Sequence, residues 1–310
     1  MPFVLHIIDS SSINFGFSDV SPKHRLVSGQ QSLSAGLLRQ PILTVVMSVA
    51  QQAEKDYDAL ATIYADYSAL PSGRLESQLI KIALGDCTGL AILDLAGGSG
   101  IHAREAVELG AARVDVVDIS SGMLRIGVDH ENALGREGVI RYLHGDASQS
   151  LSHLGLAEKS YDVVMGNWVF SFADSVDMVQ AIFRNIVAYL KPGGRFVGAR
   201  DNDPWSPALE DGKYGGSCKW VRRIPGGVKY RCVLHSTPSI EFDGACLETI
   251  YSGSSEMWEQ FGFVGLQTVP YERAEVVQKN PDFWQLFLDR PNLAVVSASL
   301  GTSTMETRGY

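Results

Sequence analysis

Hydrophobic positions along the chain first recur with a helical period and then fall into short apolar runs separated by amphipathic stretches. Spacings of three and four residues predict helices over 49–67 and 74–84, with Pro71 and Gly73 breaking the chain between them. From residue 91 on, the pattern predicts strands that alternate with helices. The expected strands are 91–95, 113–117, 139–144, 161–165 and 195–199, and the expected helices are 101–109, 121 to about 135, and 176–190.

Strands that alternate with helices indicate βαβ units and a parallel sheet with helices on both faces. Ligands of such sheets bind at the carboxyl ends of the strands, where the strand order reverses. Asp94, Asp118, Asp146 and Asn167 each lie at or just after the end of an expected strand. The sequence therefore predicts that these side chains converge on one crevice.

The pattern changes after residue 201. Residues 218–224 and 228–235 predict a hairpin around Pro225-Gly226-Gly227, residues 239–251 a third strand, and residues 255–261 a short helix. Strands over 264–269 and 293–300 close the chain. We interpret 202–252 as a β-rich insertion covering the crevice within one domain over 49–300, preceded by a loosely docked extension (1–48) and followed by a tail (301–310).

A glycine-rich turn follows the first expected strand, with the sequence Asp94-Leu95-Ala96-Gly97-Gly98-Ser99-Gly100. Such a turn brings backbone close to a ligand, and the N–H groups of the next helix hold its polar parts. Residues 98–103 satisfy G-x-G-x-x-G/A, and Asp118 lies 20 residues after Gly98, as in dinucleotide-binding proteins. Because any nucleoside cofactor needs a similar turn and carboxylate, NAD is one of two candidates at this point.

The second candidate comes from a resemblance that covers about 55–300. In order and spacing, the motifs resemble those of the class I S-adenosylmethionine-dependent methyltransferases, of the small-molecule type that acts on quinones, sterols and secondary metabolites. That family has a Rossmann-like, doubly wound seven-stranded sheet, mostly parallel with an antiparallel last strand. The similar segments are 94–100, Asp118-Ile119-Ser120 with Met123-Leu124, Gly145-Asp146-Ala147, 161–164, 190–194 and Gly262-Phe263.

The resemblance implies S-adenosylmethionine as the cofactor. Asp94 would lie near its ammonium group, Asp118 would accept hydrogen bonds from the ribose hydroxyls, and Asp146 would bind the adenine amine. Ala96 departs from the glycine usual in the family. The implied cofactor-binding residues are Tyr64, Asp94, Ala96, Gly97, Gly98, Gly100, Asp118, Ile119, Met123, Gly145, Asp146, Ala147, Asn167 and Trp168.

The expected activity is methyl transfer to an oxygen, nitrogen or carbon atom of a small aromatic or apolar metabolite. Such a displacement depends on alignment and exclusion of water, and an oxygen nucleophile would gain from a general base, for which His235, Asp201 and Tyr214 are candidates. Two alternatives remain: a protein of this fold that binds the cofactor without methylating, and a nicotinamide oxidoreductase.

Composition limits the partners. The net charge of −9 disfavours nucleic acid, because nucleic-acid binding depends on Lys and Arg. The four cysteines lack the spacing of a zinc site or disulfide framework, so no metal is expected. Apolar runs too short for a membrane span, and a start without a basic residue ahead of a short apolar run, favour a cytoplasmic protein. We expect a small-molecule acceptor and a monomer or homodimer.

Overall fold

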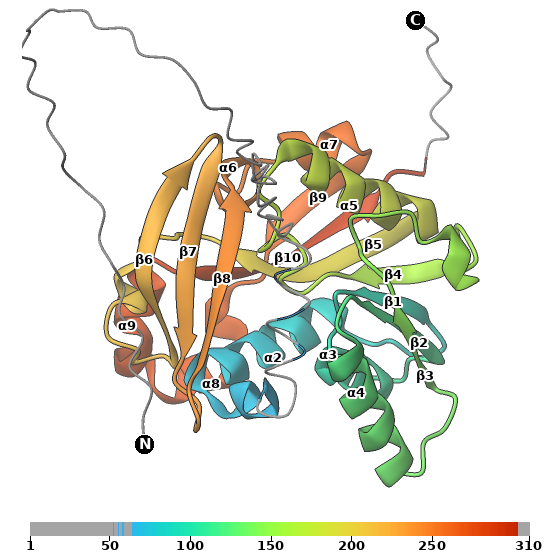
Figure 1. Ribbon diagram of the computed structural model, residues 1–310, viewed down its shortest axis with the longest axis horizontal. Helices are drawn as coiled ribbons and strands as arrows, with labels where there is room; N and C mark the ends of the chain where they lie inside the picture. Colours follow the sequence, from blue (N-terminus) through green and yellow to red (C-terminus); the bar gives the residue numbers. More distant parts are fainter. Residues whose placement is uncertain (1–51, 53–54, 56–57, 59–63, 303–310) are drawn as a thin grey trace, which may run out of the picture. The chain divides into compact units, whose positions relative to one another are not determined.

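The centre of the domain is a seven-stranded sheet with the strand order β3-β2-β1-β4-β5-β10-β9 (Figure 1). The computed structural model describes residues 52, 55, 58 and 64–302. Strand β10 runs antiparallel to both of its neighbours, and the pairs among β1 to β5 are parallel. This arrangement confirms the expected Rossmann-like fold. The strands are β1 Ala91–Leu95, β2 Arg113–Asp118, β3 Ile140–His144, β4 Tyr161–Met165, β5 Leu190–Asp201, β9 Phe263–Thr268 and β10 Leu293–Leu300.

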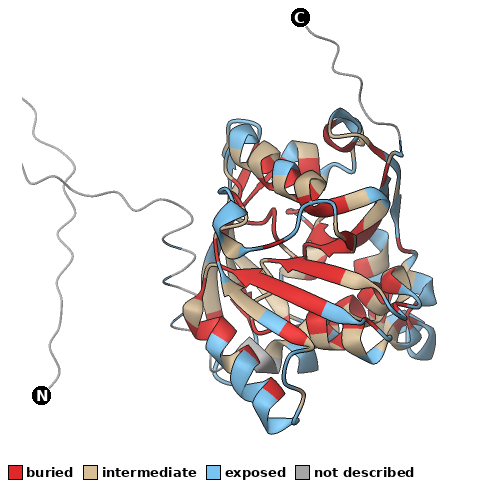
Figure 2. Cartoon of the chain, turned by 90° about the vertical axis from the view of Figure 1, so that its right-hand side faces the viewer, coloured by how far each residue is buried: buried red, intermediate tan, exposed pale blue. Residues whose placement is uncertain are grey.

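Helices cover both faces of this sheet, because alternate residues of each strand point to opposite faces. Leu93 belongs to one hydrophobic core with Phe183 and Trp258, whereas its neighbour Ile92 belongs to a second core with Leu79. Figure 2 shows the buried strands between these layers. The helices are α2 Pro71–Leu84, α3 Ile101–Glu108, α4 Ser121–Ala133, α5 Val176–Tyr189, α6 Glu248–Tyr251, α7 Glu256–Gln260, α8 Glu275–Lys279 and α9 Pro281–Asp289, with 3-10 helices η1 Tyr64–Ala69, η2 Ser152–Leu154, η3 Pro207–Leu209 and η4 Tyr271–Arg273.

A separate antiparallel sheet of three strands comes from the segment expected as an insertion (Figure 1). Its strands are β6 Gly216–Ile224, β7 Gly227–Leu234 and β8 Ile240–Leu247, in the order β6-β7-β8. The backbone N–H of Ala245 donates to the carbonyl oxygen of Ser171 at 2.9 Å, and Phe172 forms a β-bridge with Ala245. The small sheet is thus joined to the segment that follows β4, beside the strand ends.

The structure corrects some expected boundaries. Strand β5 begins at Leu190 instead of Arg195, and Tyr161 of β4 pairs with Leu190, so the expected 190–194 turn is part of the strand. Pro71 begins α2 instead of breaking a helix, because the first helical position needs no N–H donor. Helices α8 and α9 lie where the sequence analysis places no element.

Other expectations fall on residues outside the described set. The extension over 1–48 lies there entirely, as does most of the tail. Of the helix expected over 49–67, residues 52, 55 and 58 are helical, and the end of the segment belongs to the 3-10 helix η1.

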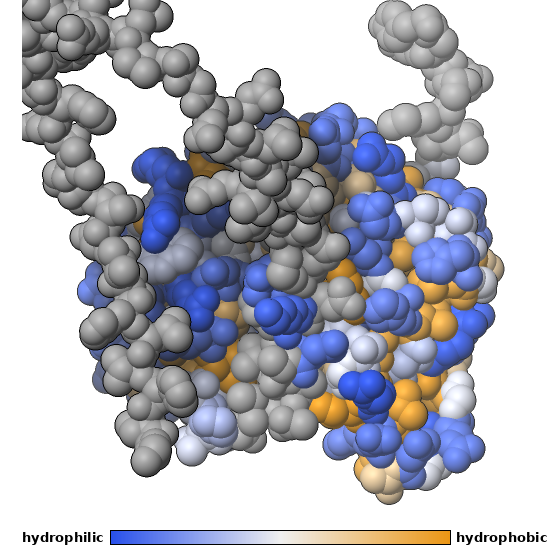
Figure 3. Space-filling view, in the orientation of Figure 1, coloured by the Kyte–Doolittle hydropathy of each residue, from blue (hydrophilic) through white to orange (hydrophobic). Residues whose placement is uncertain are grey.

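Hydrophilic residues lie among smaller apolar areas over the coloured part of the face in Figure 3. The large apolar side chains that are exposed among the described residues include Val128 of α4 and Leu134, which directly follows this helix. Over the same residues, none of the helices has the length and apolar character needed to cross a membrane.

Candidate functional site

A cavity of about 1250 Å³, open space at its mouth included, lies at the carboxyl ends of β1, β2, β3 and β4. We call it the strand-end pocket. It includes the point where the order of the parallel sheet reverses, between β1 and β4. Crevices at this position bind ligands in open α/β sheets.

The glycine-rich turn forms one wall of this pocket in a left-handed backbone conformation. The φ angles are 58° at Ala96, 56° at Gly98 and 77° at Gly100. The carboxylate of Asp94 lies directly below Gly97, since a Cβ added to Gly97 would be 2.6 Å from Asp94 Oδ2. The positive φ of Ala96 is unfavourable for a residue with a Cβ.

Asp118 holds the turn and the next connection together. Its Oδ2 accepts a hydrogen bond from the N–H of Gly98, and its Oδ1 accepts one from the N–H of Ser120, each at 2.8 Å. Burial raises the pKa of Asp118 to about 6. A carboxylate offers about four acceptor positions, so Asp118 can also accept two hydrogen bonds from a pair of hydroxyl groups in the pocket.

Two buried polar groups near the pocket lack a hydrogen-bond partner among the described residues. Asp94 is 0% exposed, and both of its carboxylate oxygens are unpaired. Burial raises the pKa of this carboxyl to about 7. The side-chain oxygen of Asn167 accepts from the N–H of Ala199, but its Nδ2 has no partner. Unsatisfied buried groups are costly and rare, so they indicate where a polar ligand binds.

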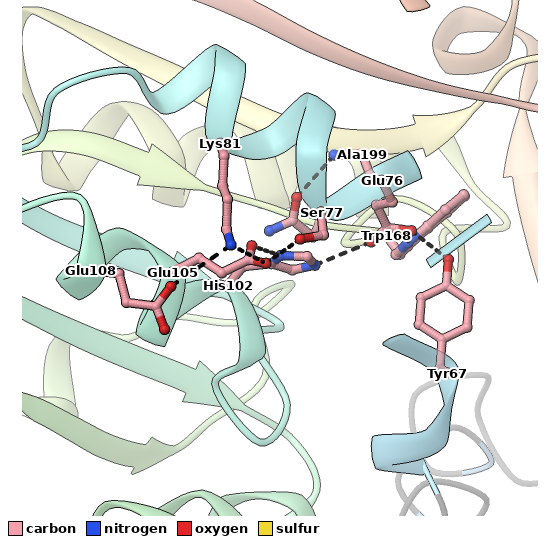
Figure 4. Close-up of polar contacts among 10 residues, drawn as sticks. Tyr67, Glu76, Ser77, Lys81, His102, Glu105, Glu108, Trp168 and Ala199 are labelled. Atoms are coloured by element: carbon pink, nitrogen blue, oxygen red, sulfur yellow. Dashed lines mark hydrogen bonds and ion pairs between the residues drawn. The ribbon is translucent and has the colours of Figure 1, made fainter. Parts of the chain in front are cut away.

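A second polar cluster centres on Glu76 of α2, which is 1% exposed (Figure 4). Its Oε2 accepts hydrogen bonds from the hydroxyl of Tyr67 at 2.5 Å and from the indole N–H of Trp168 at 3.0 Å. Its Oε1 lies 3.1 Å from His102 Nε2, and His102 Nδ1 lies 2.8 Å from Glu105 Oε2. One buried carboxylate therefore ties together η1, α3 and the segment after β4.

His102 is positively charged in this cluster. Burial by itself lowers the pKa of the imidazole, but the hydrogen bonds that it donates to Glu105 and Glu76 and the charges of both carboxylates raise it to about 10. Ser77 donates to Glu105, and Lys81 lies 3.5 Å from the same carboxylate. The buried negative charge of Glu76 thus has an imidazolium as its counter-charge.

A second cavity, of about 850 Å³ with its open mouth included, lies between β5 and the three-stranded sheet. We call it the insertion pocket. Its wall is mostly apolar and shares Tyr67, Trp168 and Phe172 with the strand-end pocket. Its other lining residues are Ser72, Ser171, Asp201, Pro204, Ala208, Leu209, Tyr214, Gly216, Cys218, Tyr230, Cys232, Leu234, Phe242, Asn292 and Leu293.

Asp201, at the end of β5, is the one carboxyl group among these lining residues. Its Oδ2 accepts a hydrogen bond from the hydroxyl of Ser171 at 2.6 Å, and its Oδ1 accepts one from the hydroxyl of Tyr230 at 3.0 Å. Burial raises the pKa of Asp201 above its usual value. The carboxyl is thus held in a fixed orientation in an apolar wall.

The structure brings most of the proposed cofactor-binding residues together. Asp94 lies beneath the turn instead of in the wall, and Gly100 caps α3, where a Cβ would be 2.5 Å from the hydroxyl of Tyr142. Tyr64 begins η1, and its side chain is outside the described set. The residues that line the strand-end pocket are Ala96, Gly97, Gly98, Asp118, Ile119, Met123, Gly145, Asp146, Ala147, Asn167 and Trp168.

The three candidate bases do not form one site. Asp201 and Tyr214 line the insertion pocket, but the hydroxyl of Tyr214 donates to the carbonyl oxygen of Phe283 at 2.8 Å and accepts from the N–H of Phe287 at 3.2 Å. His235 is exposed, pairs with Ser217 at 2.8 Å and lines neither pocket. Of the three, Asp201 has the position of a group that can act on a bound molecule.

The sequence analysis overlooked Tyr67, Glu76 and His102, which also line the strand-end pocket. The signal for Glu76 was present, because this charged residue falls on the buried side of α2 with Leu75 and Leu79. A carboxylate on an apolar helix face needs a buried partner. The sequence does not indicate that the partners come from η1, α3 and the segment after β4.

The family model described as a methyltransferase domain matches residues 92–194, which hold the glycine-rich turn and the strand-end residues of β1 to β4. This part of the chain is similar to the class I S-adenosylmethionine-dependent methyltransferases. S-adenosylmethionine is the cofactor of that family, and the unpaired Asn167 amide and the Asp118 carboxylate, both in the pocket wall, suit its carboxylate and ribose groups.

Known members resemble this methyltransferase domain to different extents. It is 32% identical over 130 residues to the ubiquinone/menaquinone biosynthesis C-methyltransferase UbiE of Idiomarina loihiensis. That match covers 40% of this chain and 49% of the relative, so the chain spans about half of the relative's length. The fold is similar to that of the CcbJ methyltransferase of Streptomyces caelestis, with a TM-score of 0.57, 17% identity, and 81% and 99% of the two chains covered. The [4+2]-cyclase SpnF has a similar fold, with a TM-score of 0.51, 16% identity, and 83% and 98% covered.

Proposed function

We propose that this protein transfers the methyl group of S-adenosylmethionine to a small, mostly apolar molecule held in the insertion pocket. The observation that carries the proposal is the wall common to the two cavities, formed by Tyr67, Trp168 and Phe172. A cofactor in the strand-end pocket and an acceptor in the insertion pocket would meet at these aromatic side chains. The wall of the second cavity is mostly apolar with a few polar groups, as is usual for small-molecule sites.

In this proposal, different residues of the strand-end pocket bind different parts of the cofactor. Asp118 would accept hydrogen bonds from the ribose hydroxyls, Ile119 and Met123 would pack against adenine, and Asp146 would accept from the adenine amine. The Oδ1 of Asp146 is already oriented by the N–H and hydroxyl of Ser148, at 2.8 and 2.7 Å. When bound, S-adenosylmethionine supplies a methyl group made electrophilic by its sulfonium.

The protein contributes alignment and a dry environment to such a displacement. Positioning of two reactants accounts for up to about 7–11 kcal/mol of a barrier in favourable intramolecular models. Trp168 is well suited to this role, because its indole N–H is fixed on buried Glu76. Aromatic faces also attract a neighbouring cation such as a sulfonium.

The acceptor atom is carbon, nitrogen or oxygen, and the name of the UbiE relative favours carbon. The alternative is cofactor binding without methyl transfer. The fold similarity to SpnF, whose name gives it as a [4+2]-cyclase, supports this alternative.

Calorimetric titration with S-adenosylhomocysteine, with NAD as the comparison, tests the proposal. We expect micromolar or tighter binding of S-adenosylhomocysteine, and loss of that binding in Asp118→Ala. A preference for NAD would overturn the proposal. Binding of S-adenosylhomocysteine with no methylated product from a broad set of small apolar acceptors would favour the alternative.

A further inference from the structure

The charges around the insertion pocket restrict the molecule that it can hold. Its lining residues include no Lys, Arg or His, and their one carboxyl group is Asp201. Arg200 is next in the chain, but its side chain donates to the backbone oxygens of Asp201 and Tyr251 and is not part of the wall. A carboxylate or phosphate group in this cavity would therefore meet a like charge without a counter-ion.

The rest of the wall is apolar or neutral. Trp168, Phe172 and Phe242 present aromatic side chains. Cys218 and Cys232 lie opposite each other on β6 and β7, and burial raises the pKa of both thiols, so they are uncharged at neutral pH. Flat apolar molecules suit such a wall.

The single charged group is arranged to accept a hydrogen bond. Ser171 and Tyr230 each donate to a different oxygen of Asp201. The thiol of Cys246 is a third donor to this carboxylate. Because a carboxylate has about four acceptor positions, Asp201 can accept one more bond. Ser171 lies in the same segment as Trp168 and Phe172, so Asp201 is held close to the wall that the two pockets share.

On these grounds we propose that the acceptor is an uncharged aromatic molecule whose hydroxyl group donates a hydrogen bond to Asp201. This inference rests on the proposed function, because it assigns the acceptor of that reaction. It excludes phosphorylated and carboxylated metabolites as acceptors. A cationic amine would pair with the Asp201 charge but would lose its hydration in an apolar wall, whereas a hydroxyl group donates to Asp201 without that desolvation cost.

Three probes of matched size separate these chemistries: 1-naphthol, 1-naphthoate and protonated 1-naphthylmethylamine. Binding to the whole protein is measured by calorimetry, with and without saturating S-adenosylhomocysteine. We expect 1-naphthol to bind at least about tenfold more tightly than 1-naphthoate, because a hydrogen bond to a charged group contributes about 1.5–3 kcal/mol. Equal or tighter binding of the naphthoate, or tightest binding of the amine, overturns the proposal.

The variant Asp201→Asn tests whether the preference for 1-naphthol depends on the side chain of Asp201. We expect its affinity for 1-naphthol to fall about tenfold and its discrimination against 1-naphthoate to shrink. The matched control is Asp243→Asn, which changes a half-exposed carboxylate on the same small sheet that does not line the pocket. Unchanged probe affinities in Asp201→Asn contradict the proposal, and the comparison of the three probes in the unmodified protein tests it even if this variant fails to fold.

Failure of the proposed function would give a different experimental result from failure of the inference about the acceptor. If the unmodified protein does not bind S-adenosylhomocysteine, the proposed function fails, whatever the probes show. If it binds S-adenosylhomocysteine but does not prefer 1-naphthol, only the inference about the acceptor fails.

Discussion

The strand-end pocket and the insertion pocket share three aromatic residues but are built in different ways. The first is built around short connections that each follow a strand of a parallel sheet, and these connections place carboxylates and backbone N–H groups in a wall that is otherwise largely apolar. The second consists of aromatic and aliphatic side chains from two sheets, with one carboxyl group. A site made of local turns can keep its chemistry while the rest of the chain changes, whereas a site made of distant side chains changes with any of them.

The largest effect is expected at Glu76, which accepts hydrogen bonds from two of the side chains shared by the pockets, Tyr67 and Trp168. Replacement of Glu76 by Gln removes the negative charge that faces His102. It also puts an amide N–H₂ group, which can only donate, next to groups that themselves donate hydrogen bonds. We expect the free energy of unfolding to fall by about 3 kcal/mol, because the substitution removes one of the two carboxylates that pair with buried His102 and leaves only Glu105. Urea denaturation measures the change, with Glu108→Gln on the exposed side of α3 as the control.

The pH dependence of stability identifies the cause of this loss. The pKa of His102 is raised in the folded protein to about 10, above its ordinary value of 6.5. Its contribution is therefore fully present below pH 6.5 and is lost as the pH rises through about 10. We expect Glu76→Gln to lose less stability than the unmodified protein between pH 7 and 10. An identical alkaline loss in both proteins would show that Glu76 does not act through His102.

A variant of the strand-end pocket should separate the two cavities. We expect Asp118→Ala to weaken binding of S-adenosylhomocysteine about 100-fold, because it removes a charged acceptor for two hydroxyl groups. Binding of 1-naphthol in the absence of that ligand should stay within about twofold, since Asp118 does not line the insertion pocket. Calorimetry on both ligands tests this, with the exposed Asp129→Ala on α4 as control. Parallel losses for the two ligands would contradict the separation.

The same carboxylate predicts a pH dependence for cofactor binding. Burial raises the pKa of Asp118 to about 6, and its ionised form accepts the hydrogen bonds. Affinity for S-adenosylhomocysteine should therefore be constant above about pH 7 and fall about tenfold for each pH unit well below 6. Titrations between pH 5 and 8 test this, and an affinity that is flat down to pH 5 would show that a different group binds the ribose.

The smallest effect is expected at the residue that departs from the family pattern. Ala96 has a φ of 58°, where a Cβ costs about 1–2 kcal/mol, and part of this cost is offset by the greater chain entropy of glycine. We expect Ala96→Gly to raise the free energy of unfolding by about 1 kcal/mol and to leave cofactor affinity within about twofold. Thermal denaturation and the same titration measure both. A lower stability would mean that the Ala96 methyl group contributes more by packing than it costs in strain.

The contrast between the pockets also explains what the sequence could predict. Strands β1, β4 and β10 have the expected bounds, because short apolar runs between turn residues specify a buried strand. Asp118 and Asp146 were placed correctly at strand ends, since topology brings such ends together. The placement needs no knowledge of side-chain packing.

The insertion pocket could not be predicted in this way. Asp201 meets Tyr230 of β7 and Ser171 of the segment after β4, which are neighbours only after both sheets have packed. His235 has the chemistry of a base but lines neither cavity, and nothing in the alternation of the expected strand over 228–235 indicates this. Glu76 shows the same limit, because its partners come from three elements.

The position of Trp168 has a thermodynamic consequence. This residue lies in both walls, has a φ of 61° and is bonded to Glu76, so a shift of its ring alters both cavities at once. If a bound cofactor changes the affinity of the insertion pocket for its ligand, that ligand must change the affinity for the cofactor by the same factor. In the proposed reaction, such coupling through Trp168 would make the release of one product change the affinity for the other.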